Sequence, residues 1–421
     1  MPVRKRFSKK RHVTPTNSSL EAFLASKPLY YKEIDHLRVH HAYAMLKPHI
    51  RRPETIHIVG TNGKGSTGRI MAHLAYTSFQ RSATKGKKKR GFVGHYTSPH
   101  ILRFNERIWI DGRDANDATL EAAHRKLYGI LGQEMSEALS YFEYTTLLAF
   151  TVFEHCELMV LEAGLGGEFD ATNVCNKELS VVTPIGLDHQ AFLGESIEAI
   201  AETKLRSIQK RALLAPQPYD EVYRVAAHIA KEKGAELFIS EVVDIPHLSA
   251  TRYPLPTATV STLKTVASEK GWPDFLVQNA IVAMQALELT GIAYDVDDLR
   301  SLELFGRFYP FLPNVRIDVG HNPLAAQALV EAMEEDSVLI YNSLDDKDYE
   351  TVLRILKPKL KRVELIPIES QRAATLDAIE AALRKLDIPY TRFETIHPDE
   401  HYVVFGSFYT VEAFLKNADA L

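Results

Sequence analysis

The sequence predicts an α/β protein of two domains: a mostly parallel, doubly wound sheet domain followed by a smaller α/β domain. Short apolar runs alternate with helical patterns, the arrangement typical of parallel sheets. A glycine-rich turn joins an early apolar run to a helix, and 421 residues exceed one ordinary hydrophobic core. We expect a basic, disordered tail over residues 1–17, a first domain over 18–296 and a second over 297–421.

The first domain is predicted from apolar periodicity. The helical patterns cover residues 18–50, 70–79, 117–131, 142–154, 196–208 and 277–287. The strand-like runs cover residues 55–59, 91–97, 157–161 and 179–183. Residues 235–270 mix short β-type runs with prolines and threonines, which we interpret as a small subdomain or excursion.

The second domain repeats the alternation after a joint at residues 302–310. Its predicted strands cover residues 314–319, 338–341, 362–368 and 402–405. Its predicted helices begin at Pro323, which suits a first helical turn, and cover residues 349–356, 375–386 and 409–415.

The composition excludes several classes of protein. A hydrophobic content of 45% with 25% charged residues indicates a soluble globular protein, and the net charge of -4 gives no general attraction to nucleic acid or to an anionic membrane. No apolar run is long enough to cross a bilayer. Two cysteines, Cys156 and Cys175, argue against a disulfide framework and fit a reducing cytoplasm. We interpret the basic N-terminus as a solvated tail, and the basic cluster at 85–90 as a surface loop.

The segment Thr55-Ile-His-Ile-Val-Gly-Thr-Asn-Gly-Lys-Gly-Ser-Thr67 reads as strand, glycine loop and helix. A loop without Cβ atoms lets backbone N–H groups close on a phosphate, and the helix N-terminus adds partial positive charge. Lys64 would reach the outer phosphates, and Ser66 or Thr67 could face a magnesium ion. A tight structural turn is the alternative, but the lysine, the hydroxyls and the flanking elements together favour nucleotide binding. The spacing is not that of kinases and GTPases.

Polar residues follow the ends of four predicted strands, at Lys64, Ser98, Glu162 and His189. Because the carboxyl ends of parallel strands meet at one crevice, we expect these side chains to converge there. A glutamate, a histidine and a hydroxyl beside a triphosphate can share magnesium. Taken singly, Glu162 could cap a helix, His189 could be a hydrogen-bonded loop residue and Ser98 could start a turn.

Lys204 lies in an apolar stripe with Ile197, Ile200 and Ile208 at three- and four-residue spacing. Such a lysine usually extends to solvent. A partly desolvated lysine can instead be neutral and open to chemical modification.

The ordered motifs resemble a known family. They are Gly60-Thr-Asn-Gly-Lys-Gly-Ser-Thr67, Thr97-Ser-Pro-His100, Asn105-Glu-Arg-Ile108, Glu162-Ala-Gly-Leu-Gly-Gly167, Asp170-Ala-Thr-Asn173, Gly186-Leu-Asp-His189, Gly306-Arg-Phe308, Asp318-Val-Gly-His-Asn-Pro323, Asp346-Lys-Asp348 and Phe405-Gly-Ser-Phe-Tyr409. Together they resemble folylpolyglutamate synthase / dihydrofolate synthase, of the Mur ligase superfamily. The resemblance implies a P-loop-containing ATP-binding domain of the Mur ligase central type and a Rossmann-like C-terminal glutamate ligase domain.

The resemblance implies an ATP-dependent amide ligase that adds L-glutamate to dihydropteroate or to the glutamate of a folate through an acyl phosphate. ATP would be a co-substrate and one or two Mg²⁺ ions the cofactor. We expect a cytoplasmic monomer with small-molecule substrates and with neither nucleic-acid nor membrane partners.

The resemblance also implies roles for residues at the matching motif positions. The expected catalytic residues are Lys64, Glu162, His189 and Lys204. The expected metal ligands are Ser98, Glu162, His189 and, if carbamylated, Lys204. The expected ATP contacts are Gly63, Lys64, Gly65, Ser66, Thr67, Asn279, Arg307 and Asp318. The expected pterin contacts are Phe142, Glu143, Tyr144, Thr145, Phe169, Asp170 and Ala171. The expected glutamate contacts are His321 and Ser407.

Several positions depart from the family pattern. Glu168 stands where arginine is usual, and Leu205-Arg206 follow Lys204 where Ala-Gly is usual. Gly320 replaces the usual alanine before His321, and Phe305 replaces the usual proline before Gly306.

Three alternatives predict other behaviour. A Mur-type peptidoglycan ligase would share the ATP chemistry but use a UDP-sugar substrate. A P-loop kinase or GTPase would leave Asp318, His321 and Ser407 without a role. A non-catalytic nucleotide-binding relative would not need Lys64, Glu162 and His189.

Overall fold

The computed structural model describes residues 19–27, 35, 37–84, 91–240 and 249–418. The predicted tail at 1–17 and the basic cluster at 85–90 lie outside these residues. The chain forms two compact units, one from Met1–Arg51 with Asn116–Val152 and the other from Arg52–Ala115 with Phe153–Leu421.

The first unit is helical. Its helices are α1 (Leu20–Ala25), α2 (Arg38–Leu46), α4 (Asp117–Ala138) and α5 (Tyr141–Val152), with the 3-10 turn η1 (Lys47–His49). Ser19 and Asn116 accept backbone N–H groups at the starts of α1 and α4, which caps both helices. Lys27 donates to the carbonyl oxygens of Ser136 (2.5 Å) and Leu139 (2.7 Å), so its charge sits at the C-terminus of α4.

The second unit contains a large sheet whose described strands run in the order β4-β3-β2-β5-β1-β6-β7-β8-β9. The strands are β1 (Glu54–Val59), β2 (Val93–Tyr96), β3 (Ile108–Ile110), β4 (Arg113–Asp114), β5 (Leu158–Glu162), β6 (Leu179–Val182), β7 (Arg211–Leu214), β8 (Glu236–Ile239) and β9 (Thr251–Arg252). All neighbouring pairs are parallel except those that β3 makes with β2 and β4. Because Ile58 pairs with Glu162 and Val59 with Val182, three central strands end at one edge.

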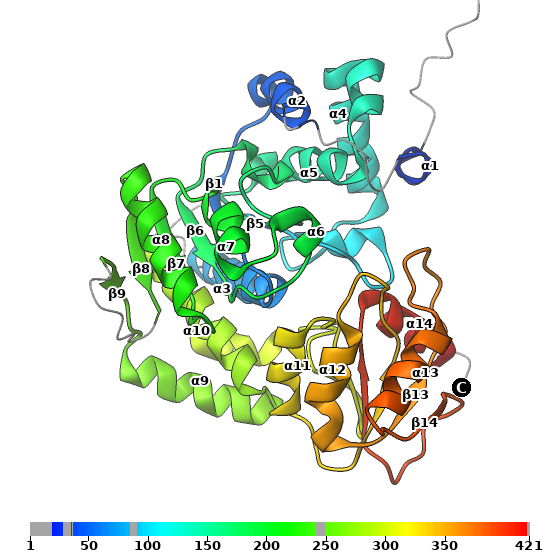
Figure 1. Cartoon of the computed structure of the whole chain (residues 1–421). Helices are drawn as coiled ribbons and strands as arrows, with labels where there is room; N and C mark the ends of the chain where they lie inside the picture. Colours follow the sequence, from blue (N-terminus) through cyan, green and yellow to red (C-terminus); the bar gives the residue numbers. More distant parts are fainter. Residues whose placement is uncertain (1–18, 28–34, 36, 85–90, 241–248, 419–421) are drawn as a thin grey trace, which may run out of the picture. The chain divides into compact units, whose positions relative to one another are not determined.

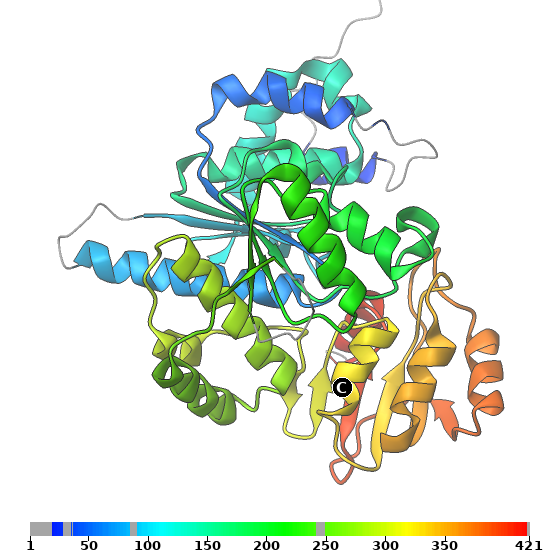
Figure 2. The same ribbon diagram turned by 60° about the vertical axis from the view of Figure 1, so that its left-hand side comes forward.

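Helices cover both faces of this sheet, as predicted. They are α3 (Lys64–Thr84), α6 (Gln190–Leu193), α7 (Ile197–Leu205), α8 (Asp220–Lys233), α9 (Thr257–Lys270) and α10 (Asp274–Leu289), with the 3-10 turns η2 (Phe104–Arg107), η3 (Phe153–His155), η4 (Ala171–Val174) and η5 (Val296–Ser301). One core cluster joins the sheet to α3 and α10, and a second joins its other face to α7 and α8 (Figures 1 and 2).

Within residues 235–270, interpreted as a small subdomain or excursion, Thr257–Lys270 form α9. Its threonines favour strands locally, but Leu263, Val266 and Ala267 are buried at helical spacing. Tertiary packing therefore overrides the local preference. The short strands β8 and β9 lie within the same predicted segment.

A smaller sheet lies C-terminal to the large one, with described strands in the order β10-β11-β15-β12-β13-β14. The strands are β10 (Tyr309–Leu312), β11 (Val315–Ile317), β12 (Ser337–Tyr341), β13 (Leu360–Leu365), β14 (Tyr390–Arg392) and β15 (Tyr402–Phe405). The helices are α11 (Pro323–Val330), α12 (Tyr349–Leu356), α13 (Leu376–Lys385) and α14 (Phe408–Ala418), with η6 (Lys357–Lys359). Two core clusters cover its faces.

The two sheets confirm the predicted two-domain α/β fold, and we call them the larger-sheet and smaller-sheet domains. The predicted start of a helix at Pro323 is also confirmed, since Asn322 caps α11 and Pro323 occupies its first turn. The boundary at 296/297 stays a prediction. Among the described helices, none is both long enough and apolar enough to span a membrane.

Candidate active site

The glycine loop after β1 has a shape that side chains would obstruct. Gly60 and Gly63 have positive φ angles of 146° and 84°. A Cβ on Gly60 would lie 2.0 Å from the hydroxyl oxygen of Thr183, and one on Gly63 would lie 2.7 Å from Oδ1 of Asn279. Glycine is therefore needed at both positions, and Asn279 of α10 lies directly against the loop.

Lys64 begins α3 and folds back over this loop. Its Nζ donates to the carbonyl oxygens of Gly60 and Thr61, each at 3.2 Å. Ser66 is buried and lines the cavity described below, whereas Thr67 is fully buried and its hydroxyl has no hydrogen-bond partner among the described residues. Of the two hydroxyls expected near magnesium, Ser66 is thus the one at the cavity wall.

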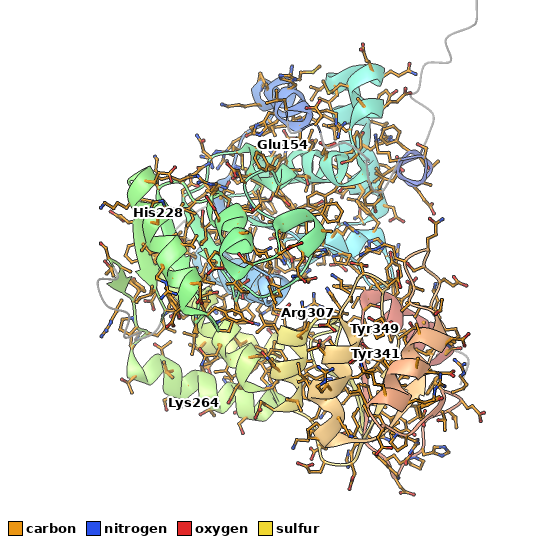
Figure 3. The ribbon with its side chains drawn as sticks, viewed as in Figure 1. Glu154, His228, Lys264, Arg307, Tyr341 and Tyr349 are labelled. Atoms are coloured by element: carbon orange, nitrogen blue, oxygen red, sulfur yellow. The ribbon has the colours of Figure 1, made fainter. Side chains whose placement is uncertain are left out.

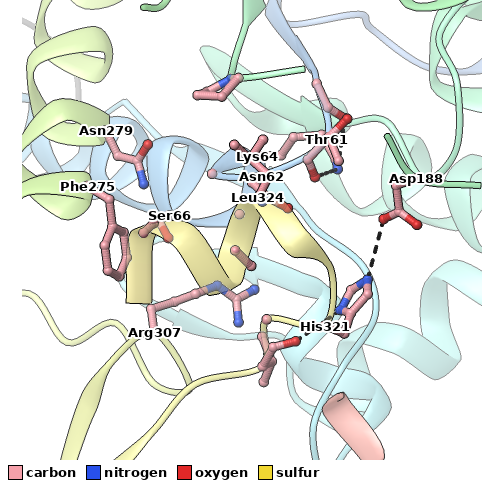
Figure 4. Close-up of a pocket in the computed structure, with 18 of the residues that line it drawn as sticks. Thr61, Asn62, Lys64, Ser66, Asp188, Phe275, Asn279, Arg307, His321 and Leu324 are labelled. Atoms are coloured by element: carbon pink, nitrogen blue, oxygen red, sulfur yellow. Dashed lines mark hydrogen bonds and ion pairs between the residues drawn. The ribbon is translucent and has the colours of Figure 1, made fainter. Parts of the chain in front are cut away.

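A cavity of about 360 Å³ opens over the loop, between the two sheet domains of the second unit. Figure 4 shows Asn279 and Phe275 on one side of it and Asp188 and His321 on the other. The predicted site residues that line it are Gly63, Lys64, Gly65, Ser66, Ser98, Glu162, His189, Lys204, Asn279, Arg307, Asp318 and His321. The side chains at four strand ends therefore converge, together with residues of the smaller-sheet domain.

Glu162 is the last residue of β5 and reaches the N-terminus of α3. Its Oε2 accepts hydrogen bonds from the Thr97 hydroxyl and, at 3.4 Å, from the Ser98 N–H. A Cβ on Gly65 would lie 3.5 Å from this oxygen and 3.1 Å from a guanidinium nitrogen of Arg307. Gly65 thus leaves room for a carboxylate and a guanidinium at the start of the helix.

Lys204 does not extend to solvent, because it is only 5% exposed on the buried face of α7. Its Nζ donates to the carbonyl oxygen of Gly60 at 3.0 Å, the acceptor that Lys64 also uses. Burial, together with the charge of Lys64, lowers the pKa of Lys204 to about 7. A large fraction of this amine is therefore unprotonated at neutral pH.

Asp188 and His189 follow β6. Burial lowers the pKa of His189 to about 4, although the neighbouring Asp188 acts in the opposite direction. The imidazole is thus neutral near pH 7 and keeps a lone pair for a metal. Burial alone would raise the pKa of Asp188, but His321, His189 and Lys347 hold it well below its ordinary value.

The smaller-sheet domain contributes Arg307, Asp318 and His321. Figure 3 places Arg307 among the inner side chains, whereas His228 and Lys264 lie at the surface. The Arg307 guanidinium carbon lies 5.3 Å from the Phe408 ring centroid. Asp318 accepts the N–H groups of Phe308 (2.8 Å) and Gly320 (2.7 Å), while burial raises its pKa.

Ser407, expected near glutamate, is buried outside the residues that line the cavity. Its hydroxyl accepts the Thr410 N–H at 3.0 Å at the start of α14. Its role toward glutamate stays a prediction.

The expected pterin contacts fall in both units. In the second, Phe169 is 55% exposed, whereas Asp170 and Ala171 are buried. Asp170 accepts from the Leu165 N–H (2.9 Å) and from the Thr172 N–H (2.9 Å) and hydroxyl (2.6 Å), while burial raises its pKa.

In the first unit, the Glu143 carboxylate accepts from Arg38 at 2.8 Å, and the Tyr144 hydroxyl lies 2.8 Å from Nδ1 of His124. Thr145 is buried and Phe142 half-buried. A pterin pocket made from both sets stays a prediction.

The predicted metal ligands lie around the phosphate loop. Within the described residues, no three His, Cys, Asp or Glu side chains form a cluster that could hold a metal. Ser98, Glu162 and His189 offer a hydroxyl, a carboxylate and an imidazole around the phosphate loop. Because magnesium is often held by one or two carboxylates with substrate phosphates, this donor set fits an ion that binds together with a nucleotide.

Sequence reasoning assigned no role to several polar residues at this site. Asn62 of the loop pairs its amide with Asn322, and Lys347 donates to Asp188 at 2.6 Å. Close to Asp170, the Lys177 side chain contacts His57 and Asn173. Asp188 and Lys347 lie within the quoted motifs, so the motifs marked them as candidates without giving their contacts.

Known proteins resemble the chain in sequence and in fold. No family model matches the chain. The dihydrofolate synthase/folylpolyglutamate synthase of Escherichia coli (strain K12) is 30% identical over 399 residues, which is 89% of this chain and 88% of that protein. The Helicobacter pylori folylpolyglutamate synthetase structure is 36% identical, with a TM-score of 0.72 over 96% of this chain and 98% of its own.

A further solved structure is a bifunctional folylpolyglutamate synthase/dihydrofolate synthase with Mn, AMPPNP and L-glutamate bound. It is 25% identical, with a TM-score of 0.75 over 96% of this chain and 99% of its own. The identity and coverage together show that the chain belongs to the dihydrofolate synthase/folylpolyglutamate synthase family.

Proposed function

We propose that this protein is an ATP-dependent ligase that joins L-glutamate to dihydropteroate, to the glutamate of a tetrahydrofolate, or to both. The observation that carries the proposal is the cavity of about 360 Å³ in which the phosphate loop, Glu162 and His189 meet Arg307 and His321 of the smaller-sheet domain. A solved relative has AMPPNP, Mn and L-glutamate bound, which supports the same ligands here.

In the first step, a carboxylate oxygen of the pterin substrate attacks the γ-phosphorus of ATP. The bond between this phosphorus and the bridging oxygen to the β-phosphate breaks, which yields an acyl phosphate and ADP. Phosphoryl transfer depends mainly on positioning and on charge neutralisation. Lys64, the N–H groups of the glycine loop and Arg307 supply positive charge around the phosphates.

Magnesium held by Ser98, Glu162 and His189 would supply further charge neutralisation. Lys204 is placed to contribute in a modified form. Its amine reacts with carbon dioxide only when unprotonated, and its pKa of about 7 provides that form at neutral pH. We propose that its carbamate is an anionic ligand for a second ion.

In the second step, the unprotonated amine of L-glutamate attacks the acyl carbon. The carbon–oxygen bond to phosphate breaks, an amide forms, and one proton is released. His321 lines the cavity and lies on the side opposite Asn279, where the amino acid would enter (Figure 4). Phe142, Phe169 and Asp170 would hold the pterin, and Ser407 would lie near the incoming glutamate. We further propose a cytoplasmic monomer.

The test is a reaction in which each component is omitted in turn. We expect ADP, phosphate and a glutamylated product only when ATP, Mg²⁺, L-glutamate and a pterin substrate are all present. Dihydropteroate and tetrahydrofolate are compared side by side by mass spectrometry. Absence of product with both substrates, or product from a UDP-muramyl acceptor instead, contradicts the folate assignment.

Two substitutions test the phosphate site. Lys64→Ala and Glu162→Ala remove groups at the cavity wall, so we expect product formation to fall by on the order of a hundredfold or more in each. Circular dichroism should show an unchanged fold. Lys264→Ala, at an exposed position of α9, is the control and should retain full activity. Substantial activity in either site variant means that the phosphate site is elsewhere.

A further inference from the structure

A buried ion pair joins the two sheet domains beside the cavity. Asp188 lies in the loop after β6, and Lys347 lies in the loop after β12, 159 residues further along the chain. The Lys347 Nζ donates to the Asp188 carboxylate at 2.6 Å. The two side chains are only 3% and 8% exposed, so the pair is largely shielded from solvent.

The Asp188 carboxylate also receives other groups of the smaller-sheet domain. The Asn322 side-chain amide donates to it at 3.1 Å, and the His321 imidazole lies 3.7 Å away (Figure 4). The backbone N–H of His189 donates to the same carboxylate at 2.9 Å. Asp188 therefore fixes the start of the His189 turn and anchors three side chains of the opposite domain at once.

A second pair of hydrogen bonds joins the same two domains. Asn322 pairs its amide with that of Asn62, which belongs to the phosphate loop. The segment after β11 thus touches both the phosphate loop and the His189 loop. Separation of the domains would break these contacts together.

Lys347 has another carboxylate close by. Asp346, on the same loop, lies 3.7 Å from its Nζ and is much more exposed than Asp188. A buried charge without a partner is strongly unfavourable. Asp346 can keep Lys347 paired when the domains separate, whereas the buried Asp188 carboxylate pairs with Lys347 only when they meet.

We propose that Asp188 and Lys347 form a positioning pair that holds the smaller-sheet domain over the phosphate loop while the acyl phosphate exists. The proposal rests on the proposed function. Neither side chain needs to touch the reacting atoms. The pair keeps Arg307 and His321 at the cavity, and it keeps water away from the acyl phosphate until the glutamate amine attacks.

The consequence is measurable as a product ratio. Attack by the amine gives one amide and one phosphate, whereas attack by water returns the free carboxylate and gives one phosphate without product. An enzyme that excludes water from the acyl phosphate therefore releases about one phosphate per glutamylated product. An enzyme that admits water releases more phosphate per product. A loss of folded protein alone lowers the yields of phosphate and of product equally, so the ratio does not change.

The experiment compares Lys347→Met with the wild type and with Lys359→Met, which removes a lysine from an exposed ion pair of the same domain. We expect the phosphate-to-product ratio to rise at least threefold in Lys347→Met and to stay near one in the wild type and in Lys359→Met. An unchanged ratio in Lys347→Met overturns the positioning role.

The double variant Asp188→Asn with Lys347→Met guards against a misfolded single variant. It leaves no unpaired buried charge, so it should fold at least as well as Lys347→Met while still showing the raised ratio. A normal ratio in the double variant also overturns the proposal.

Hydrogen exchange with AMPPNP and Mg²⁺ gives a readout that needs no turnover. The amides of residues 186–193 and 315–330 should exchange faster in Lys347→Met than in Lys359→Met. Equal exchange rates contradict the proposed positioning role of Asp188 and Lys347. If the wild type makes no glutamylated product, the proposed function is wrong. Hydrogen exchange still shows whether the Asp188–Lys347 pair holds the two sheet domains together.

Discussion

Burial changes the chemistry of several lysines in this fold. Lys177 is 3% exposed, and burial lowers its pKa to about 8. Its Nζ contacts Nδ1 of His57 at 3.2 Å, and Nε2 of His57 lies 2.7 Å from the Thr172 hydroxyl, which donates to Asp170. A continuous chain of polar contacts thus connects Lys177 to Asp170.

The first residue-scale prediction concerns pH. The folded state lowers the pKa of Lys177 from 10.5 to about 8, so the unfolded chain binds more protons between these values. Stability from this group therefore increases as pH rises from about 8 to about 10.5. Lys177→Met lacks this group, so its free energy of unfolding should not show the increase. The free energy of unfolding of Lys177→Met minus that of the wild type should therefore fall by on the order of 1–3 kcal/mol over that window.

Denaturant unfolding near pH 7 and pH 10 measures this difference, with Lys210→Met, at an exposed position, as a control that should keep the pH dependence of the wild type. A stability difference between Lys177→Met and the wild type that is independent of pH contradicts the lowered pKa.

Two of the departures from the family pattern, Glu168 and Arg206, lie close enough to interact. A hydrogen bond with Glu202 is the main cause that raises the pKa of Arg206, and Glu168 adds a smaller effect in the same direction. Burial lowers the pKa of Lys233, and Glu168 acts in the opposite direction. The backbone N–H of Glu168 donates to the Thr203 carbonyl at 2.9 Å, which ties this loop to α7. The sequence identified both substitutions separately. Their proximity depends on the packing of the loop against the helix.

At the scale of elements, the phosphate loop depends on glycines for two separable reasons. Gly63 has a positive φ and also faces Asn279, whereas Gly234, at the end of α8, has a positive φ of 63° with no atom within 4 Å of an added Cβ. A side chain would strain the backbone at both positions, but only at Gly63 would its Cβ also clash with another residue.

This contrast gives a matched pair of substitutions. Gly63→Ala should displace the loop from Asn279 and raise the KM for ATP at least tenfold. Gly234→Ala should cost only about 1 kcal/mol of stability and leave the KM for ATP unchanged. Steady-state kinetics and thermal unfolding on both variants separate the two effects. Equal KM values would mean that the loop tolerates a side chain.

Elements were predictable where local pattern and burial agree. Strands β1, β5 and β6 were found because apolar runs end abruptly in glycine or polar residues, which also located Lys64, Glu162 and His189. The short strands β10 and β14 were missed because three or four half-exposed residues leave little periodicity. Helix α9 was not predicted because its threonines favour strands, while its buried face is set by tertiary contacts.

At the scale of the whole second unit, the site belongs to neither sheet alone. Asn279 comes from a helix of the larger-sheet domain, and Arg307 and Asp318 come from the joint and the first part of the smaller one. Motif order predicted that these residues serve one site. The contacts that bring the domains together, such as Asp188 with Lys347, depend on packing between distant segments and left no periodic signal.

The last prediction tests whether nucleotide binding uses both domains. At a ligand concentration of about 100 times Kd, AMPPNP with Mg²⁺ should stabilise the wild type by about 2.7 kcal/mol. Loss of a charge-assisted contact weakens binding by roughly 10- to 100-fold. Arg307→Ala should therefore retain only about 0.4–1.4 kcal/mol of stabilisation at the same concentration, measured by thermal unfolding. Arg224→Ala, at an exposed position of α8, should respond like the wild type. Because Arg307 is the guanidinium beside Gly65, a full response in Arg307→Ala would mean that the nucleotide is held by the larger-sheet domain alone.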